Sequence, residues 1–279
     1  MDLSTTLKLN DGARIPVLGV GTYKIPDADT PAVIGSALDA GYRHIDTAAL
    51  YGNERGVGRG IREALSDQAG LDRSELFVTT KVWNTEHGFD ETLRAFDASL
   101  DALGLDRVDL YLIHWPVPAQ NRYVETWRAL VRLREEGRAT SIGVSNFHRP
   151  HLERIIDDSG VVPAVNQIEL QPWLQQAELR ALHAELGIVT EAWSPLARGR
   201  AIGDPVLGAI GERHGKSAAQ VVIRWHLQLG NVVIPKSLSA ERLRANADVF
   251  DFELDAAELA VIAGLDAAER SGSNPDLVD

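Results

Sequence analysis

The chain has 279 residues, of which 44% are hydrophobic, and it carries a formal net charge of −12 and no cysteine. A chain of this length buries about three quarters of its unfolded surface, so we expect residues 1-279 to form a single domain. The negative charge opposes binding to nucleic acid or anionic membrane, and the lack of cysteine excludes disulfides and thiolate metal sites. A small-molecule partner fits this composition better.

The N-terminal segment has no basic stretch followed by an apolar one, and no later stretch approaches the ~20 apolar residues of a membrane span. We therefore expect a cytoplasmic protein with neither a membrane nor a nucleic-acid partner, and we expect a monomer. The first predicted element is a hairpin, because Asn10-Asp11-Gly12 separates two short apolar runs. We interpret this hairpin as a plug over one end of the barrel predicted below.

From Val17 to Leu265, short β-branched runs alternate with amphipathic helical stretches, which indicates a parallel sheet with crossover helices. Eight candidate strands favour a closed (β/α)8 TIM barrel. In chain order they are LGVGT from Leu18, RHIDTA from Arg43, LFVTTKVW from Leu76, VDLYLIHW from Val108, TSIGVSN from Thr140, AVNQIEL from Ala164, IVTEAW from Ile188 and NVVIP from Asn231.

The intervening helices carry start and stop signals. Thr30-Pro31 begins one helix and Gly41 ends it. Another helix ends at Gly104 and presents one apolar stripe, which we interpret as core: Phe89, Leu93, Phe96, Leu100 and Leu103. Capping boxes begin two late helices, at Ser217 with Gln220 and at Asp255 with Glu258. Between them we expect a short extra helix that begins at Ser239, and the last helix then closes the barrel.

An open dinucleotide-binding sheet is the competing architecture, but the sequence lacks G-x-G-x-x-G between a strand and a helix. Gly56, Gly58 and Gly60 come closest. They lie in a stretch where apolar residues recur at helical spacing, so we interpret them as permitting close helix packing.

In a closed barrel the active site lies at the carboxyl ends of the strands, where Asp46, Lys81 and His114 end three neighbouring runs and Tyr51 follows the first. Taken alone, Asp46 is as often a turn cap, and a single Tyr or His is more often core. Lys81 is one of five lysines and interrupts an apolar run, so it needs a partner, which Asp46 supplies. A cation beside Tyr51 favours phenolate and makes the phenol a better proton donor for carbonyl reduction.

A basic cluster follows the eighth strand, where barrels commonly bind phosphate, and suits the extra phosphate of NADPH. Its members are Lys236, Ser237, Arg242 and Arg244. Ser145, Asn146 and Gln167 end the fifth and sixth strands with groups able to bind a carboxamide, and Trp193 ends the seventh with a ring that can stack on nicotinamide. A solvated basic face and loop capping are the structural alternatives. We expect no metal site, since His148 and His151 begin a helix beside two arginines on a solvated face.

These segments resemble the aldo-keto reductase family over nearly the whole chain. The resemblance rests on DTAALYGNE, KVW, LIHWP, GVSNF, NQIEL, WSPL and IPKS, in the family's order and spacing, and is closest to bacterial diketogluconate-reductase-like members. It implies NADPH as cofactor, Tyr51 as general acid tuned by Lys81 and Asp46, and His114 as the residue that orients the carbonyl. It also implies cofactor contacts from Gly21, Thr22, Asp46, Ser145, Asn146, Gln167, Trp193, Ser194, Leu196, Lys236, Ser237, Arg242 and Asn246.

The same resemblance implies a substrate pocket walled by Tyr23, Trp83, His114 and Trp115. Short loops after LIHWP and VFDF predict that this pocket is open and accepts several aldehydes and ketones. Three residues depart from the family pattern: Trp193 replaces a tyrosine, Ala245 a glutamate and Gln171 a histidine.

Two other functions compete with carbonyl reduction. An NADPH-binding sensor or scaffold subunit would need no catalytic residues, and a Schiff-base lyase would use Lys81 as a neutral amine. The presence of all four catalytic residues argues against the first, and the neighbouring Asp46 argues against the second.

Overall fold

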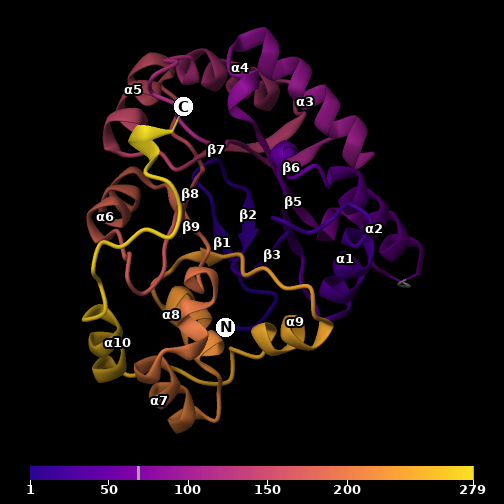
Figure 1. The fold of residues 1–279 in the computed structure, drawn as a ribbon. Helices are drawn as coiled ribbons and strands as arrows, with labels where there is room; N and C mark the ends of the chain where they lie inside the picture. The colour runs from indigo at the N-terminus through magenta and orange to yellow at the C-terminus, as the bar shows by residue number, and fades with distance from the viewer. Residues whose placement is uncertain (68–69, 279) are drawn as a thin grey trace.

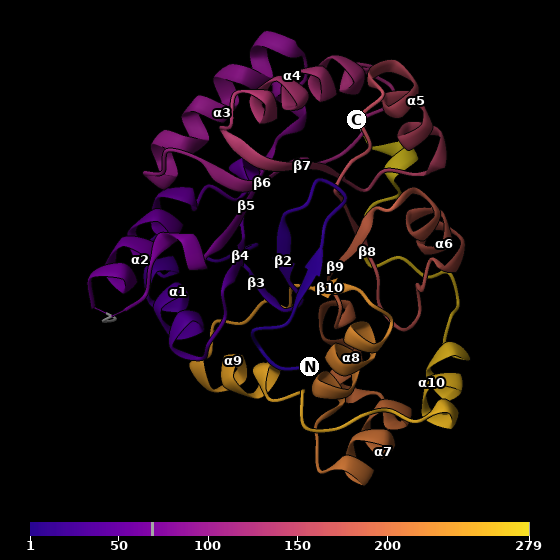
Figure 2. The same cartoon turned by 180° about the vertical axis from the view of Figure 1, so that it is seen from behind.

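The computed structural model describes residues 1–67 and 70–278. In this part of the chain, eight parallel strands form one sheet (Figures 1 and 2), which confirms the predicted barrel. The sheet closes because Leu18 forms a parallel bridge with Val233, whose N–H donates to the Val17 oxygen. The strands are β3 Gly19–Gly21, β4 His44–Asp46, β5 Phe77–Val82, β6 Val108–Ile113, β7 Ala139–Ser145, β8 Val165–Glu169, β9 Val189–Trp193 and β10 Val232–Val233.

Helices surround the sheet on its outer side (Figure 1). They are α1 Thr30–Asp39, α2 Glu54–Asp67, α3 Phe89–Leu103, α4 Tyr123–Glu135, α5 Arg149–Ser159, α6 Ala177–Leu186, α7 Pro205–His214, α8 Ala218–Gln228, α9 Ala240–Ala247 and α10 Ala256–Ala263. None of the helices in the described residues is long and apolar enough to cross a membrane.

The predicted hairpin is present as β1 (Thr6–Lys8) and β2 (Arg14–Pro16), which pair in antiparallel register. Leu9 and Ile15 pack against the residues that begin β5, β8 and β10. The Asn10 side chain also donates a hydrogen bond of 2.9 Å to the Pro163 carbonyl. The hairpin therefore covers the amino-terminal ends of the strands, which leaves the carboxyl ends for a site.

The helix signals are largely confirmed. Both capping boxes form, at Ser217 and at Asp255. Gly104 ends α3 in the left-handed conformation with a φ of 66°. The interpretation of the α3 stripe as core is wrong for Phe89, which is 39% exposed. Helical side chains lean toward the N-terminus, and the first residue of a helix has no preceding turn to pack on.

The two helices after β10 take places other than those predicted. α9 contacts both α1 and α8, so it occupies the eighth position of the outer ring. α10 lies apart from the ring, below α6 in Figures 1 and 2. The extra helix of this half of the barrel is instead α7, which precedes α8 between β9 and β10.

Close packing of α2 explains its glycines. A Cβ on Gly58 would overlap the Leu103 carbonyl oxygen at the end of α3. We expect Gly58→Ala to lower the free energy of unfolding by about 1–3 kcal/mol, because backbone atoms would have to move apart. Gly35→Ala in α1 is the matched control, since its Cβ meets nothing within 4 Å. It should raise stability by about 0.5–1 kcal/mol. Urea denaturation of both variants measures the difference, and equal stabilities would contradict the close contact.

Candidate active site

A cavity of about 650 Å³ opens at the carboxyl ends of the strands, opposite the hairpin. Three of the four predicted catalytic side chains, those of Asp46, Tyr51 and His114, line it. Lys81 lies beneath them and is fully buried. The structure therefore brings together the residues that the strand ends predicted.

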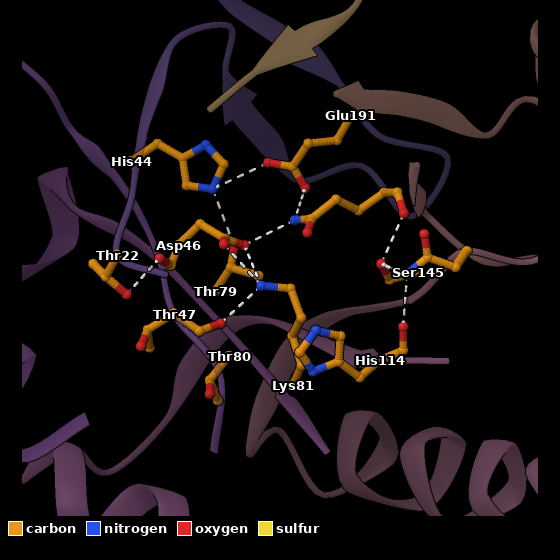
Figure 3. A network of polar contacts seen from close by, with 12 residues as sticks. Thr22, His44, Asp46, Thr47, Thr79, Thr80, Lys81, His114, Ser145 and Glu191 are labelled. Carbon is orange, nitrogen blue, oxygen red and sulfur yellow. Dashed lines mark hydrogen bonds and ion pairs between the residues drawn. The ribbon is translucent and has the colours of Figure 1, made fainter. Parts of the chain in front are cut away.

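Lys81 and Asp46 form a buried ion pair at the floor of the cavity. Lys81 Nζ donates to the two Asp46 carboxylate oxygens at 2.7 and 2.8 Å and to the Thr47 carbonyl at 2.8 Å (Figure 3). Parallel pairing of β4 with β5 places the two side chains together. Burial lowers the pKa of Lys81, but the Asp46 charge raises it and prevails, so Lys81 remains an ammonium.

Tyr51 is the last residue of a short 3₁₀ helix, Ala49–Tyr51, which Gly52 ends with a φ of 66°. Its ring centroid lies 5.2 Å from Lys81 Nζ and 5.7 Å from the His114 ring. Burial raises the pKa of Tyr51 to about 12, and the Lys81 charge opposes this only in part. As expected, the Lys81 charge favours the phenolate of Tyr51, but burial outweighs this effect and the net shift of the pKa is upward. The phenol is held neutral and able to donate a proton.

His114 follows β6 and faces the same space. Its ring packs edge-on against Trp83 with 5.1 Å between centroids. Burial, and then the Lys81 charge, lower the pKa of His114 well below its usual value. The imidazole is therefore neutral, and its one N–H group can donate a hydrogen bond to a carbonyl oxygen.

The residues predicted to bind a carboxamide are already connected to one another. Ser145 Oγ donates to the Gln167 carbonyl, and the Asn146 side chain donates to the His114 carbonyl at 3.0 Å. Trp193 Nε1 donates to Asn146 Oδ1 at 2.9 Å, which fixes the indole at the end of β9. The Gln167 amide nitrogen points elsewhere, toward Asp46 and Glu191.

The basic cluster lies beside the cavity at the start of α9. Ser239 caps this helix by accepting from the Arg242 N–H at 3.3 Å, as predicted. Ser237 Oγ accepts from the Ser239 N–H at 3.1 Å. Lys236 lines the cavity itself, whereas Arg242 and Arg244 are exposed on the helix. Lys236 thus lies at the cavity, and the two arginines lie on the adjoining helix.

Most of the other predicted site residues also reach the cavity. Those that line it are Gly21, Tyr23, Asp46, Tyr51, Trp83, His114, Trp115, Ser145, Asn146, Gln167, Trp193, Ser194, Leu196 and Lys236. Those that do not are Thr22, Lys81, Ser237, Arg242 and Asn246. Thr22 is buried behind Asp46, whose carbonyl accepts from the Thr22 hydroxyl at 3.0 Å.

The C-terminal tail forms part of the cavity wall, which the sequence did not predict. Gly272, Ser273 and Val278 line the cavity, together with Ile202 from the loop after β9. Glu169, at the end of β8, holds this tail by accepting from the N–H groups of Ser271 at 2.6 Å and Gly272 at 3.0 Å. The C-terminal tail thus narrows the pocket that was expected to be open. The tail is polar and shows no hydrophobic periodicity, so its position could not be predicted from the sequence.

Gln171 also holds the tail. Its side chain donates to the Glu269 carbonyl at 2.9 Å and accepts from the Trp173 N–H at 2.7 Å. Gln171 departs from the family pattern, and these two bonds give it a structural role.

His148 and His151 do not form the solvated face that was predicted. His151 is buried against the rings of Tyr123 and Phe147. His148 Nδ1 lies 2.9 Å from a carboxylate oxygen of Asp276, so this histidine contacts the C-terminal tail. Within residues 1–67 and 70–278, no group of three or more His, Cys, Asp or Glu side chains could hold a metal ion.

Comparisons with known proteins agree with this geometry. The model of the Aldo/keto reductase family matches residues 17–205 and 203–267. An aldo-keto reductase of Mycobacterium sp. (strain JLS) is 57% identical over 96% of this chain and 95% of its own length. A methylglyoxal reductase DkgA of Yersinia pestis is 47% identical over 99% of this chain and 98% of its own.

Among solved structures, a Gox0644 mutant in complex with NADPH superposes with a TM-score of 0.93 at 49% identity, covering 99% of this chain and 98% of its own. The family match, the relatives and this superposition all extend over the strands that carry the site. The chain therefore belongs to the aldo/keto reductase family.

Proposed function

We propose that this protein reduces aldehydes and ketones to alcohols with NADPH, reversibly, and that Tyr51 is the general acid. One observation carries the proposal: a fully buried ammonium, paired with Asp46, lies under a neutral phenol and a neutral imidazole that share one cavity. The methylglyoxal reductase relative and the NADPH complex of a similar structure support the reaction and the cofactor.

When bound, NADPH supplies a hydride to the carbonyl carbon. Negative charge then grows on the carbonyl oxygen, and groups fixed in advance stabilise it best. His114 donates a hydrogen bond to that oxygen, and Tyr51 transfers its proton to it. Lys81 stabilises the phenolate that remains on Tyr51, and Asp46 keeps Lys81 in place.

The residues present fit the cofactor. Trp193, fixed by Asn146, offers an aromatic face for the nicotinamide, and the polar groups of Ser145 and Asn146 lie beside it. Lys236 at the cavity edge and Arg242 on α9 would hold phosphate. Ser194, Leu196, Ser237 and Asn246 complete the proposed cofactor contacts, with Gly21 and Thr22 near the reacting end.

Arg242 should favour the binding of NADPH over NADH, since only NADPH has the additional phosphate. We expect Arg242→Ala to weaken NADPH binding by about 1.5–3 kcal/mol, the value of a charge-assisted hydrogen bond, and NADH binding little. Titration of tryptophan fluorescence with each cofactor measures both dissociation constants. Glu241→Ala, an exposed neighbour one position earlier on α9, is the control for a change of surface charge. An equal loss for the two cofactors in Arg242→Ala would contradict the phosphate assignment.

The substrate class follows from the wall of the cavity. Tyr23, Trp83 and Trp115 give it an aromatic side, which suits small carbonyl compounds that carry apolar groups. Following NADPH absorbance with a panel of aldehydes and ketones tests the proposal. Oxidation of NADPH that depends on the carbonyl supports it, and NADPH binding without turnover of any carbonyl would instead favour a sensor.

A Schiff-base lyase is disfavoured by one observation. Its reaction needs a neutral amine at Lys81, whereas the Asp46 charge raises the pKa of this lysine. A cytoplasmic location and a monomeric state remain part of the proposal, as does the likeness to diketogluconate-reductase-like members.

A further inference from the structure

A second buried carboxylate, that of Glu191, is linked to the Lys81–Asp46 ion pair through the side-chain amide of Gln167. The Gln167 side-chain nitrogen donates to Asp46 Oδ2 at 2.8 Å and to Glu191 Oε2 at 2.9 Å. An amide nitrogen carries two hydrogens, so these bonds use both. The Gln167 amide therefore bridges Asp46 and Glu191.

Glu191 is fully buried on β9, and in the described part of the chain it has no cation of its own. Lys81 is bonded to Asp46. His44 Nε2 lies 3.6 Å from Glu191 Oε1 and also contacts the Thr79 hydroxyl at 3.1 Å. Burial, and then the Lys81 charge, lower the pKa of His44 to about 3, so this imidazole stays neutral. An ionised Glu191 would thus be a second, unpaired anion beside Asp46.

Burial and the Asp46 charge favour the neutral form of Glu191 and outweigh the Gln167 hydrogen bond and the Lys81 charge, which favour the ionised form. The titratable side chains that face it are His44 and Asp46 from β4 and Lys81 from β5, whereas β10 contributes only valines and β8 the Gln167 amide. Burial, and then the Asp46 charge, raise the pKa of Glu191 to about 8. At neutral pH it is a carboxylic acid, which still accepts the Gln167 hydrogen bond.

We propose that Glu191 is a positioning residue of the reduction: as a neutral acid it orients the Gln167 amide toward Asp46, and its ionisation sets the alkaline limit of carbonyl reduction. The inference rests on the proposed function. Ionisation adds a negative charge to the barrel interior, which opposes the negative charge that develops on the carbonyl oxygen. The protonated form is the more active one, so the rate of reduction is full only well below pH 8 and falls as the pH rises through about 8.

The other titratable groups of the site change their protonation state at other pH values. The pKa of Tyr51 is about 12, that of Lys81 is raised, and that of His114 is well below its usual value. A fall in rate near pH 8 therefore distinguishes Glu191 from the catalytic residues. A charge at this depth changes the rate by roughly tenfold.

The test measures kcat with saturating NADPH and methylglyoxal from neutral to alkaline pH, for wild type and for Glu191→Gln. Glutamine has the shape of the neutral acid but cannot ionise. Taking the ratio of alkaline to neutral kcat within each protein removes any change in the neutral rate. Glu54→Gln is the matched control, because Glu54 is also a buried carboxylate with a pKa raised by burial, but its partners are the Thr80 and Ser99 hydroxyls.

We expect wild type and Glu54→Gln to lose about tenfold in kcat above pH 8, and Glu191→Gln to lose little. The same loss in Glu191→Gln as in wild type would overturn the inference and leave the proposed function standing. No turnover of any carbonyl by wild type would overturn both. If Glu191→Gln does not fold, Glu191→Met replaces it, since methionine also removes the ionisable group. The wild-type fall in rate in that variant would likewise overturn the inference.

Discussion

Replacing Tyr51 with phenylalanine should lower kcat for carbonyl reduction by about 10²–10⁴-fold, the usual contribution of a positioned general acid. The variant loses only the hydroxyl group, so the ring contacts with Tyr23 and His114 remain. The dissociation constant for NADPH should therefore change little. Single-turnover measurements of NADPH oxidation, with cofactor binding measured separately, distinguish the two effects.

Tyr23→Phe is the matched control. Its ring centroid lies 5.0 Å from that of Tyr51 in the same cavity, but the side chain is 48% exposed and belongs to the rim. It should change KM more than kcat. Equal single-turnover rates in wild type and Tyr51→Phe would show that another group, or water, delivers the proton.

Replacing Lys81 with methionine should have the largest effect on stability. It leaves the Asp46 carboxylate buried without its cation, which costs roughly 3–5 kcal/mol. For a protein of this size the melting temperature should fall by roughly 10 °C. Reduction should be lost as well, because no cation then opposes the burial that raises the pKa of Tyr51.

The double variant Asp46→Asn/Lys81→Met separates these two consequences. Removing both charges leaves no unpaired ion in the core, so the double variant should be more stable than Lys81→Met alone. It should remain inactive. Calorimetry and NADPH oxidation measured on the same samples check both points. A double variant no more stable than the single one would contradict the assigned ion pair.

The sequence predicted the barrel because eight short β-branched runs alternate with amphipathic helical stretches. Lys81 was predicted as a site residue because it interrupts an apolar strand, where a lysine needs a buried partner. Glu169 and Glu191 were missed, although each lies within a predicted strand. Glu191 and Trp193 are two residues apart on one strand, so they share a face, and this alternation could have placed the glutamate inside the barrel.

Other features depend on contacts that periodicity does not encode. The tail is fixed by Glu169, about a hundred residues earlier in the chain, and nothing local in its sequence indicates this. The pKa of Tyr51 depends on how deeply the ring is buried, and the sequence revealed only its charged neighbours. The place of α9 depends on the space left between α1 and α8.

The central claim is that NADPH delivers hydride to a carbonyl carbon in this cavity. Incubating the protein with methylglyoxal and NADPH deuterated at the reactive nicotinamide carbon tests it most directly, with the product analysed by mass spectrometry and NMR. We predict that deuterium appears on the former carbonyl carbon, one for each NADP⁺ formed, and that Tyr51→Phe slows this transfer. A product without deuterium, or substrate trapped on Lys81 by borohydride, would contradict the account.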